Sequence, residues 1–498
     1  NVIFYSVLYK IIKIIEFRKV KQKFPKYKCN LDLTFLEGYE LLKVNKSSKK
    51  STCSIDLSEN DLFLISQCNL DCIVQCSSED IVGEILNLTK FGVISSFYGD
   101  NYIVNERSVG FHEVYKGKPM SSFTIRKLNQ YDDGDILFIG KLMTSGLWLQ
   151  NNAQLIEKMN TFLTKILLDL AVKKELPLLQ EKRPGKKLSK NRDSSLNLLN
   201  YLIKNSIPKI INFLISKFMS PRVIRYSIAY TYHNDHTKSL DAYKEIPNPK
   251  GRFLADPFVF EHNKSNYIFV EDLFYSDEKG RISAIKIEED KHEFLGIVLE
   301  EKFHLSYPFI FKEEDDIYMI PESHKNNDIR LYKCLEFPMK WKLEKVMMSD
   351  ISAADTTVIK KNNLWFMLTN ICSAGFDDHQ SELHIFYSED LKSNSWNSIR
   401  SGNPVIFDPL KGRNGGIFYH KDNIYRINQV HEHAFYGKSF KINEILNISS
   451  DEYIEKELMC VDANFRQDII STHHFSANAE IAAVDYTRYE RLSKILKT

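Results

Sequence analysis

The sequence predicts a multidomain protein of the α/β plus all-β class. Residues 1–150 are expected to form an α/β domain, residues 151–221 a helical and basic linker region, and residues 222–498 a five-bladed β-propeller. Three observations predict this division. Strand-like and helix-like apolar runs alternate in the first part, helical spacing with a basic stretch follows, and the last part repeats itself.

Length, charge and cysteine content limit the function classes. The chain has 498 residues, 43% hydrophobic and 27% charged, which suits about two or three domains with real cores. With 67 basic and 65 acidic residues the net charge is +2, so no nucleic-acid partner is expected. The eight cysteines are too scattered for a disulfide framework, and we expect reduced thiols in a cytoplasmic protein.

The N-terminal segment combines an apolar run with a basic stretch. Val2 to Tyr9 is apolar, but Lys10 and Lys13 interrupt it before the roughly 20 residues that a membrane span needs. Eight basic residues between Lys10 and Lys28 face one acid, Glu16. The pattern fits peripheral contact with an anionic membrane, and the alternative is a solvated helix face.

The front part alternates short apolar runs with a helical turn. Residues 62–65, 72–74 and 92–95 read as buried strands, and residues 81–86 read as a helical turn. This alternation predicts a mainly parallel, helix-covered sheet. Helical spacing follows over residues 151–170 and 196–219, separated by a basic stretch that indicates a linker.

From Arg222 onward, short aromatic and β-branched strand patterns repeat. Each of four units places a second polar residue fifteen positions after its first residue. The pairs are Asp256 with Glu271, Tyr307 with Glu322, Asp355 with Asn370, and Asn414 with Gln429. A weaker fifth unit, from Thr472 to Asp485, would close a ring with the strand near Tyr226 to Tyr232. Units about 50 to 60 residues apart with several strands each are typical of propeller blades.

The repeat brings its polar residues to one mouth of the central channel, because the two ends of a strand pair meet at one rim. We expect a funnel of carboxylates, amides and rings that binds a saccharide. The predicted substrate-binding residues are Glu271, His304, Ser306, Tyr307, Asn370, Arg413, Asn414, Gln429, His473 and His474.

Opposed carboxylates at this mouth also suit glycosyl chemistry, in which one acts as acid and the other as base or nucleophile. Asp256 is the candidate base or nucleophile. Glu322 is the candidate acid, because crowding by Asp256, Glu271 and Asp355 would raise at least one carboxyl pKa. The alternative is that polar residues at strand ends cap turns and satisfy backbone amides.

Four motifs in this region carry a family resemblance. They are Ala255-Asp256-Pro257-Phe258, His304 to Phe309, Pro321-Glu322-Ser323 and Asp355-Thr356-Thr357. In this order they resemble the propeller-like N-terminal domain of plant glucosamine inositolphosphorylceramide transferases and its bacterial relatives. The resemblance covers roughly residues 222–486 and implies a role in glycan or glycolipid assembly.

The same region is similar, more remotely, to five-bladed arabinanase- and xylosidase-type glycosidases. Those enzymes carry an Asp base on the first blade and an Asp modulator on the third. Asp256 and Asp355 match these places, and the resemblance makes Asp355 a third candidate catalytic residue. The acid Glu of those enzymes lies on a later blade than Glu322 does, so the match to a hydrolase is incomplete.

The front part resembles a formyltransferase fold, which is Rossmann-like, through residues 92–100, 110–114, 123–125 and 132–134. Formyltransferases use an Asn-x-His pair and an Asp in a D-x-G sequence. Here Ser95 and Phe97 stand at the two positions of the Asn-x-His pair, and only the Asp of the D-x-G sequence is present, as Asp132. Since Phe97 cannot move a proton or support an oxyanion, the resemblance implies a degenerate site without formyl transfer.

The leading interpretation is a carbohydrate-active transferase of surface glycan or glycolipid biosynthesis, with its site in the propeller funnel. A glycoside hydrolase using the same carboxylates and a non-catalytic glycan-binding or assembly protein are the alternatives. No GxxxxGK[ST] or HExxH motif occurs in the sequence, which disfavours P-loop ATPases and zincins. We predict no metal site and no resident cofactor, with a saccharide or glycolipid as substrate and a sugar nucleotide as candidate donor.

Overall fold

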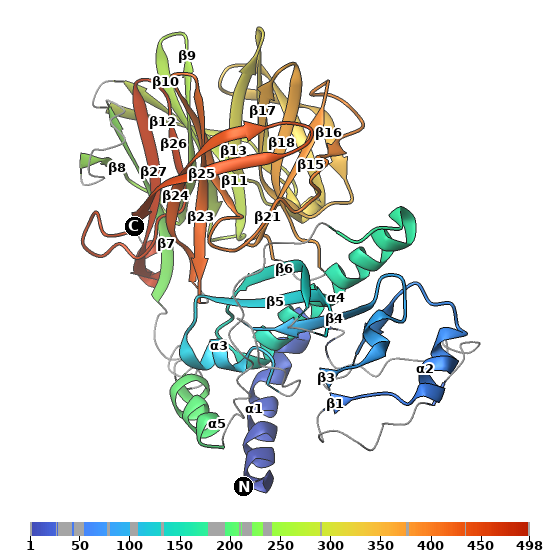
Figure 1. The fold of residues 1–498 in the computed structure, drawn as a ribbon. Coiled ribbons are helices and arrows are strands. Elements are labelled where there is room, and N and C mark those ends of the chain that lie inside the picture. The colour runs from blue at the N-terminus through green and yellow to red at the C-terminus, as the bar shows by residue number, and fades with distance from the viewer. Residues whose placement is uncertain are drawn as a thin grey trace. The chain divides into compact units, whose positions relative to one another are not determined.

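The computed structural model of the chain describes residues 2–25, 27, 42–43, 54–76, 80–99, 108–130, 134–177, 195–208, 211, 222–232, 242–288, 291–374, 378–433 and 435–496 (Figure 1). The chain divides into two units. Unit 1 comprises residues 1–210 and 374–376, and unit 2 comprises residues 211–373 and 377–498.

Unit 1 is built on a four-stranded mixed sheet with strand order β2–β4–β5–β6. β2 (Ile73–Gln75) pairs in parallel with β4 (Val93–Tyr98), whereas β4 and β6 (Asp135–Met143) both pair antiparallel with β5 (Met120–Lys127). The prediction of a mainly parallel sheet is therefore wrong. Only residues 128–134 join β5 to β6, and a parallel pair needs a far longer crossover.

The apolar run at residues 62–65 was expected to be a strand and is instead helical. It lies in α2 (Glu59–Ser66), where Ser58 is the N-cap and its Oγ accepts a hydrogen bond from the N–H of Asp61. A four-residue apolar run does not separate strand from helix, and the cap decides the outcome. The strands expected near residues 73 and 93 are confirmed as β2 and β4.

The smaller elements of unit 1 surround this sheet. The helical turn expected at residues 81–86 is confirmed only in its second half, as the 3-10 helix η2 (Glu84–Asn87). Its first residues belong to β3 (Asp80–Ile81), which pairs in parallel with β1 (Ser54–Ile55). α3 (Phe111–Lys116) precedes β5 in the chain.

Three helical segments share an apolar core in unit 1. They are α1 (Val2–Lys23), α4 (Trp148–Lys173) and α5 (Ser195–Tyr201), which continues into the π-helical segment η3 (Leu202–Ser206). The core contains Ile12 of α1, Trp148 of α4 and Tyr201 of α5. α4 confirms the helix predicted over residues 151–170 and packs on β5. None of the helices in the described part of the chain is long and apolar enough to cross a membrane.

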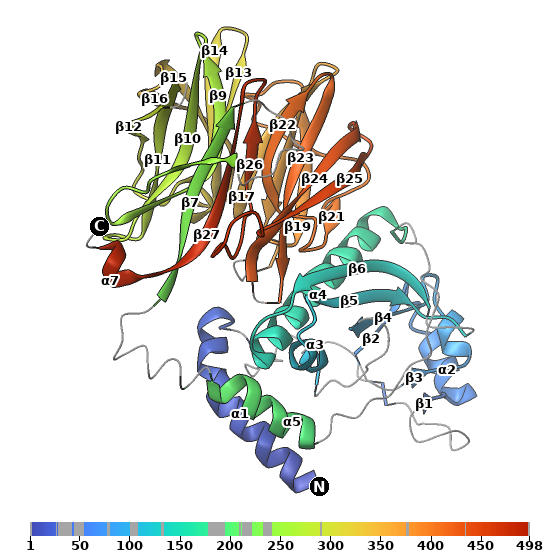
Figure 2. The same ribbon diagram turned by 90° about the vertical axis from the view of Figure 1, so that its left-hand side faces the viewer.

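In the described part of unit 2, the strands form five antiparallel sheets in a propeller-like arrangement (Figures 1 and 2). The first sheet contains β9 (Arg252–His262), β10 (Ser265–Phe274), β11 (Lys279–Glu288) and β12 (Lys291–Leu299), and the second contains β13 (Ser306–Glu313), β14 (Asp316–Glu322), β15 (Asp328–Glu336) and β16 (Lys340–Ser349). The third contains β17 (Ala353–Lys361), β18 (Leu364–Ile371), β19 (Glu382–Ser388), β20 (Asn397–Ser398) and β21 (Ile406–Phe407). The fourth contains β22 (Asn414–His420), β23 (Asn423–Glu432), β24 (Phe435–Ile448) and β25 (Tyr453–Asp462).

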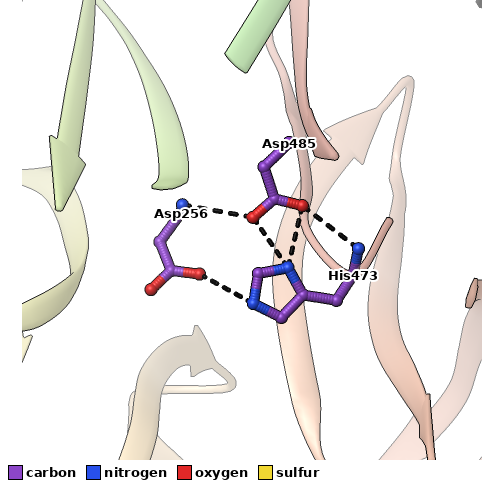
Figure 3. A group of neighbouring side chains, drawn as sticks. All are labelled: Asp256, His473 and Asp485. Carbon is purple, nitrogen blue, oxygen red and sulfur yellow. Dashed lines mark hydrogen bonds and ion pairs between the residues drawn. The ribbon is translucent and has the colours of Figure 1, made fainter. Parts of the chain in front are cut away.

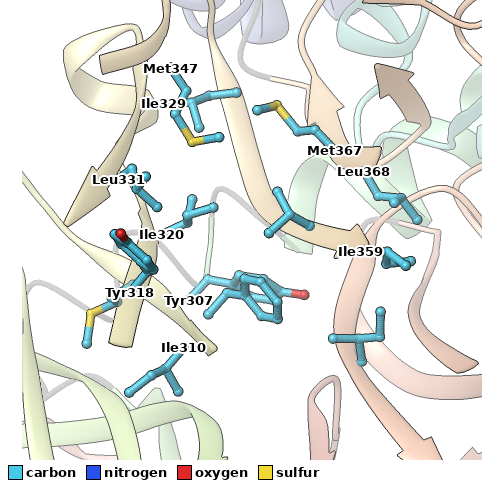
Figure 4. Packing of buried hydrophobic residues seen from close by; sticks show 14 of the residues in the cluster. Tyr307, Ile310, Tyr318, Ile320, Ile329, Leu331, Met347, Ile359, Met367 and Leu368 are labelled. Atoms are coloured by element: carbon cyan, nitrogen blue, oxygen red, sulfur yellow. The ribbon is translucent and has the colours of Figure 1, made fainter. Parts of the chain in front are cut away.

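The fifth sheet joins the two ends of the unit. β26 (Phe475–Ala477) and β27 (Ile481–Arg491) come from the C-terminal part, and β7 (Arg222–Tyr232) and β8 (Lys244–Ile246) come from the N-terminal part. β27 pairs with β7 from Ile481 opposite Tyr232 to Arg491 opposite Arg222, as expected for the weak fifth unit. The short helix α7 (Leu492–Ile495) follows β27. The largest apolar core of the unit packs between its sheets (Figure 4).

A β-bulge follows the first residues of the innermost strand in each of the first four sheets. In the first three, the residue that leaves the hydrogen-bonded register has a left-handed backbone: Asp256 (φ 48°), Tyr307 (φ 44°) and Asp355 (φ 48°). Aspartate tolerates this conformation better than tyrosine does. Such conformations are held by their surroundings and cluster at functional sites.

The fourth unit departs from the predicted alignment. Asn414 pairs with Asn428, and the bulge falls on Gly415 and Gly416, so Gly415 and not Asn414 occupies the position of Asp256. A Cβ at Gly415 would lie 2.4 Å from the carbonyl oxygen of His473. The glycines are needed because the backbone approaches the last sheet closely, which explains why this unit has no carboxylate at the bulge.

Candidate functional site

Asp256, His473 and Asp485 form a hydrogen-bonded cluster that joins the first and last sheets (Figure 3). The Nδ1 atom of His473 lies 2.7 Å from Asp485 Oδ2, and its Nε2 atom lies 3.5 Å from Asp256 Oδ1. Asp485 also accepts the backbone N–H groups of His473 and Asp256, at 3.1 and 3.3 Å. Asp485 therefore fixes the ring of His473 so that Nε2 faces Asp256.

The two carboxylates of this cluster have opposite pKa shifts. Burial raises the pKa of Asp256 to about 7, with help from nearby Glu271, Asp485 and Glu322 and against the attraction of His473. The charge and hydrogen bonds of His473 outweigh burial and lower the pKa of Asp485. Burial opposes the charge on His473, but its two carboxylate neighbours raise its pKa overall. Asp485 stays ionised, and a proton is exchangeable on Asp256 near neutral pH.

Aromatic rings surround His473. The ring of Tyr226 lies 5.1 Å from it and the ring of Tyr436 lies 5.5 Å from it, measured between centroids. Tyr226 in turn contacts Phe253 at 5.3 Å. Tyr436 is 36% exposed although it lies beside the buried cluster. Aromatic faces next to buried polar groups are typical of saccharide sites.

His431 adds a buried polar group beside Tyr436. Its Nδ1 atom accepts the N–H of Gly437 at 3.0 Å, which leaves the proton on Nε2. Burial and the charge of Arg413 lower its pKa well below the ordinary value, so the ring is neutral. Within the described residues, Nε2 has no hydrogen-bond partner.

A second cluster centres on Arg413. Its Nε atom lies 2.5 Å from Asp355 Oδ2, and its terminal nitrogen lies 3.2 Å from Glu322 Oε2. Glu322 Oε1 lies 2.6 Å from His324 Nδ1, and Gln429 donates to Asp355 Oδ2 at 2.9 Å. All the charged groups in this cluster except His324 are buried.

The proton affinities in the second cluster differ from the expectation. Although burial opposes it, hydrogen bonding to His324 and the charge of Arg413 hold the pKa of Glu322 well below the ordinary value. This direction favours an ionised Glu322, whereas a general acid must be protonated. Burial raises the pKa of Asp355 against the attraction of Arg413, with Glu322 and Asp256 adding to the shift.

Several candidate residues satisfy backbone amides of the neighbouring sheet. Asp256 accepts from Tyr307, Glu322 accepts from Asp355, and Asn370 accepts from Asn414, at 3.2, 3.2 and 2.8 Å. The capping alternative is thus correct for these contacts. Asn370 and Asn414 are fully buried and donate to backbone carbonyl oxygens. These contacts hold neighbouring sheets together, and substrate binding by Asn370 and Asn414 stays a prediction.

Three further predicted binding residues differ in their settings. His304 is partly exposed, and its Nε2 atom lies 3.2 Å from Glu271 Oε1. Ser306 is buried opposite Glu322 in the sheet. The ring of Tyr307 is fully buried and packs edge-to-face on Phe258 at 4.8 Å.

The ring of His474, another predicted binding residue, lies 5.3 Å from the ring of Tyr307, measured between centroids. Burial lowers the pKa of His474 to about 3. Tyr307 and His474 fill the interior here and do not line an open funnel.

Four residues of the site are absent from the predicted set, and no role was predicted for Asp485. The four are Tyr226, Tyr436, His431 and His324. His431 lies two positions after Gln429 on the same strand, and residues two apart share a face, so this signal was present. Asp485 ends the weak fifth unit. Its carboxylate accepts a hydrogen bond from the backbone N–H of Asp256, just as the carboxylate of Glu322 accepts one from the backbone N–H of Asp355. Tyr436 lies on β24, and the sequence does not specify how β24 pairs with β23.

The predicted degenerate formyltransferase residues lie in unit 1. Ser95 is buried in β4, and the guanidinium of Arg126 lies 5.2 Å from the centre of the Phe97 ring. Asp132 lies outside the described residues. The loss of formyl transfer stays a prediction.

Asp256, His473 and Asp485 also offer ligand atoms within 4.8 Å of one another, a spacing that could hold a metal ion. These atoms already pair with one another through His473. A cation would replace the proton on the imidazole and break that pairing.

Residues 242–474 match a family model described as glucosamine inositolphosphorylceramide transferase 1, N-terminal. Curated proteins named glucosamine inositolphosphorylceramide transferase 1 match with 34% identity over 208 residues in Oryza sativa subsp. japonica and 33% over 214 residues in Arabidopsis thaliana. The match covers 41% of this chain in both cases, and the chain spans about a quarter (27%) of each relative's length.

Solved glycosidase structures resemble the chain at low identity. The catalytic domain of the Coprinopsis cinerea GH62 α-L-arabinofuranosidase matches with 12% identity and a TM-score of 0.36, covering 52% of this chain and 97% of that one. The RS223 β-xylosidase matches with 10% identity and a TM-score of 0.34, covering 48% and 92%.

Proposed function

We propose that the chain transfers a glycosyl group in glycolipid assembly, and that its site is the Asp256–His473 cluster at one mouth of a closed five-bladed propeller. The observation that carries the proposal is the buried carboxyl of Asp256 beside His473, whose ring lies near the rings of Tyr226 and Tyr436. Burial raises the pKa of Asp256 to about 7. A general base works best when its pKa is close to the working pH.

The five-blade closure is supported by contacts between the inner strands. β9 contacts β13, β13 contacts β17, β17 contacts β22, β22 contacts β26, and β26 contacts β9. The two ends of the unit meet in the fifth sheet.

The substrate class is supported by the family match of residues 242–474 and by the names of the plant relatives. Those names point to a glycolipid with a phosphorylated, polyhydroxylated headgroup as acceptor. A sugar nucleotide is the proposed donor.

In the proposed reaction Asp256 takes the proton of the acceptor hydroxyl while that oxygen bonds to the anomeric carbon of the donor sugar. The bond from this carbon to the donor phosphate breaks, and its electron pair leaves with the nucleoside diphosphate. His473, held by Asp485, orients Asp256 and shares its proton. Because a nucleoside diphosphate leaves as an anion, this chemistry needs no protonated carboxylic acid. A glycosidase does need one, so transfer and hydrolysis place different demands on the carboxyl groups of this site.

A non-catalytic glycan-binding role is the second candidate. It is favoured by the hydrogen bonds of Asp256, Glu322 and Asn370 to backbone amides of the neighbouring sheets, because such contacts give polar residues a structural role.

Mass spectrometry of the purified chain with sugar nucleotides and glycolipid acceptors tests the proposal. We expect a glycosylated acceptor, and we expect Asp256→Asn to lower turnover by ~10²–10⁴-fold, as for a lost general base. Asp277→Asn, at an exposed turn, is the matched control and should keep full activity. Hydrolysis of glycosides without transfer would establish the hydrolase instead, and saccharide binding without turnover in the parent chain would establish the binding protein.

The proposal also retains a cytoplasmic location and a unit 1 that does not formylate. The first rests on the cysteine pattern, and the second rests on Ser95 and Phe97. Formation of an N-formylated amino sugar from formyl-tetrahydrofolate by the purified chain would contradict the second.

A further inference from the structure

Helix α1 has two apolar faces, of which only one is covered in unit 1. Leu8, Ile12, Val20 and Phe24 are buried in the unit 1 core. On the other side Phe4, Val7, Ile11 and Ile14 are 48%, 47%, 40% and 79% exposed. Their spacing of three and four residues places them in one row along the helix. A soluble helix normally has polar residues on this side, so the row needs an explanation.

The charges of α1 are divided between the buried core and the exposed surface. Its acidic residue, Glu16, is fully buried, where it accepts from Tyr201 Oη at 2.5 Å and from the N–H of Leu149 at 2.9 Å. Glu16 therefore belongs to the core and neutralises nothing on the surface. The exposed charged residues of the helix are all basic: Lys10, Lys13, Arg18, Lys19 and Lys23. No ion pair between these five and a carboxylate is found in the residues that the structure describes.

A second exposed apolar row lies on the helical segment beside α1. Tyr201 of α5 contacts Glu16 of α1, and Figure 2 shows the two helices next to each other. On this segment Leu196, Ile203 and Ile207 are exposed, and Lys204 lies among them. Two adjacent helices thus carry uncovered apolar side chains together with basic ones.

We propose that this surface, defined by Phe4, Val7, Ile11, Ile14 and the basic residues of α1, binds unit 1 to an anionic phospholipid membrane. Apolar side chains enter the interfacial region while lysine and arginine pair with lipid phosphates and carboxylates. A second copy of the chain fits less well, because a symmetric contact would bring the two basic surfaces together. The inference goes beyond the proposed glycosyl transfer and does not depend on it.

Cosedimentation of the full 498-residue chain with lipid vesicles tests this proposal. We expect binding to vesicles of phosphatidylcholine with phosphatidylserine, weak binding to phosphatidylcholine alone, and release by salt. Ile11→Ser with Ile14→Ser should weaken binding by about tenfold or more, since burial of such side chains is lost. Lys13→Gln and Lys19→Gln should each weaken binding to the anionic vesicles roughly fivefold.

Ile454→Ser with Leu458→Ser is the matched control, because both side chains are exposed on β25 of unit 2. It should leave vesicle binding unchanged, and all variants should keep the unfolding midpoint of the parent. The proposal is overturned if the parent binds neither vesicle, if the control weakens binding as much as the α1 variants, or if the α1 variants abolish dimerisation in light scattering and leave vesicle binding intact.

Discussion

The two carboxylate clusters of unit 2 differ in the cation that faces them. Glu322 and Asp355 share the guanidinium of Arg413, at 3.2 and 2.5 Å. Asp256 faces the imidazole of His473 at 3.5 Å, and Asp485 holds that imidazole. Arginine stays charged at any working pH, whereas histidine gains and loses its proton near neutrality. The Arg413 cluster is therefore suited to holding sheets together, and the Asp256 cluster is suited to exchanging a proton.

A residue type that recurs at the same position of two sheets does not by itself indicate the same role. Asp256 and Asp355 occupy the same bulge in their sheets, with the same left-handed backbone. Their roles differ because the neighbouring side chains differ. The bulge that Asp256 and Asp355 share is thus a property of the fold, and the chemistry of each carboxylate comes from its partner.

Removal of Arg413 should have the largest effect on stability. Arg413→Met leaves Glu322 and Asp355 buried without their shared cation, and breaking a buried pair in this way costs about 3–5 kcal/mol. Denaturant unfolding measures this loss. Arg400→Met, at an exposed ion pair with Asp451, is the control and should change the free energy of unfolding by less than about 1 kcal/mol. Equal effects of the two variants would contradict a structural Arg413 cluster.

The pH dependence of stability should report the raised pKa of Asp256. The folded pKa of Asp256, about 7, lies above its ordinary value. The folded protein therefore binds more protons than the unfolded chain between about pH 4 and pH 7. Stability from this group falls as pH rises through that window, and the raised pKa of His473 acts in the same direction.

Relative to Asp256→Asn, the parent should lose on the order of a few kcal/mol between the two ends of the window. Unfolding curves at a series of pH values provide the measurement. A difference between parent and variant that stays flat or rises with pH would contradict the raised pKa.

Isosteric amides should show a smaller contrast between the clusters. Glu322→Gln weakens charge-assisted hydrogen bonds to Arg413 and His324 and should cost roughly 1–3 kcal/mol in unfolding free energy. Asp256→Asn keeps a group that can accept from Tyr307 and should cost less at pH 7. The reverse order of the two costs would show that Asp256 is the structural cap.

The smallest stability change is expected at Tyr436, which is partly exposed beside His473. Tyr436→Ala should change the free energy of unfolding by about 1 kcal/mol or less while weakening saccharide binding in calorimetry. Tyr436→Phe keeps the stacking face and should retain most of the affinity. Loss of binding in Tyr436→Phe and not in the alanine variant would rule out stacking.

The repeat made the sheets of unit 2 predictable, because each unit carries its own strand pattern. It also located Asp256, Glu322 and Asp355 near Arg413 and His473. The sequence did not reveal which partner each carboxylate meets, since these contacts join residues as far apart as Asp256 and Asp485. The hairpin of the fourth unit pairs residues 14 positions apart, where the others pair residues 16 apart, and this difference misaligned Asn414.

Unit 1 was less predictable for a different reason. The run at residues 62–65 is too short to show a period, and the Ser58 cap makes it helical. The sheet contains one parallel pairing and two antiparallel ones. Alternation of elements therefore predicted the existence of the sheet but not the direction of its strands.

The proton affinity of Asp256 tests the central claim most directly. Infrared difference spectra of the parent and Asp256→Asn chains, recorded across a pH series, isolate the carboxyl stretch of this residue. The proposal predicts that the protonated band disappears with a pKa of about 7. A band already absent at pH 5, as for an ordinary aspartate, would contradict the claim that Asp256 exchanges a proton near neutral pH.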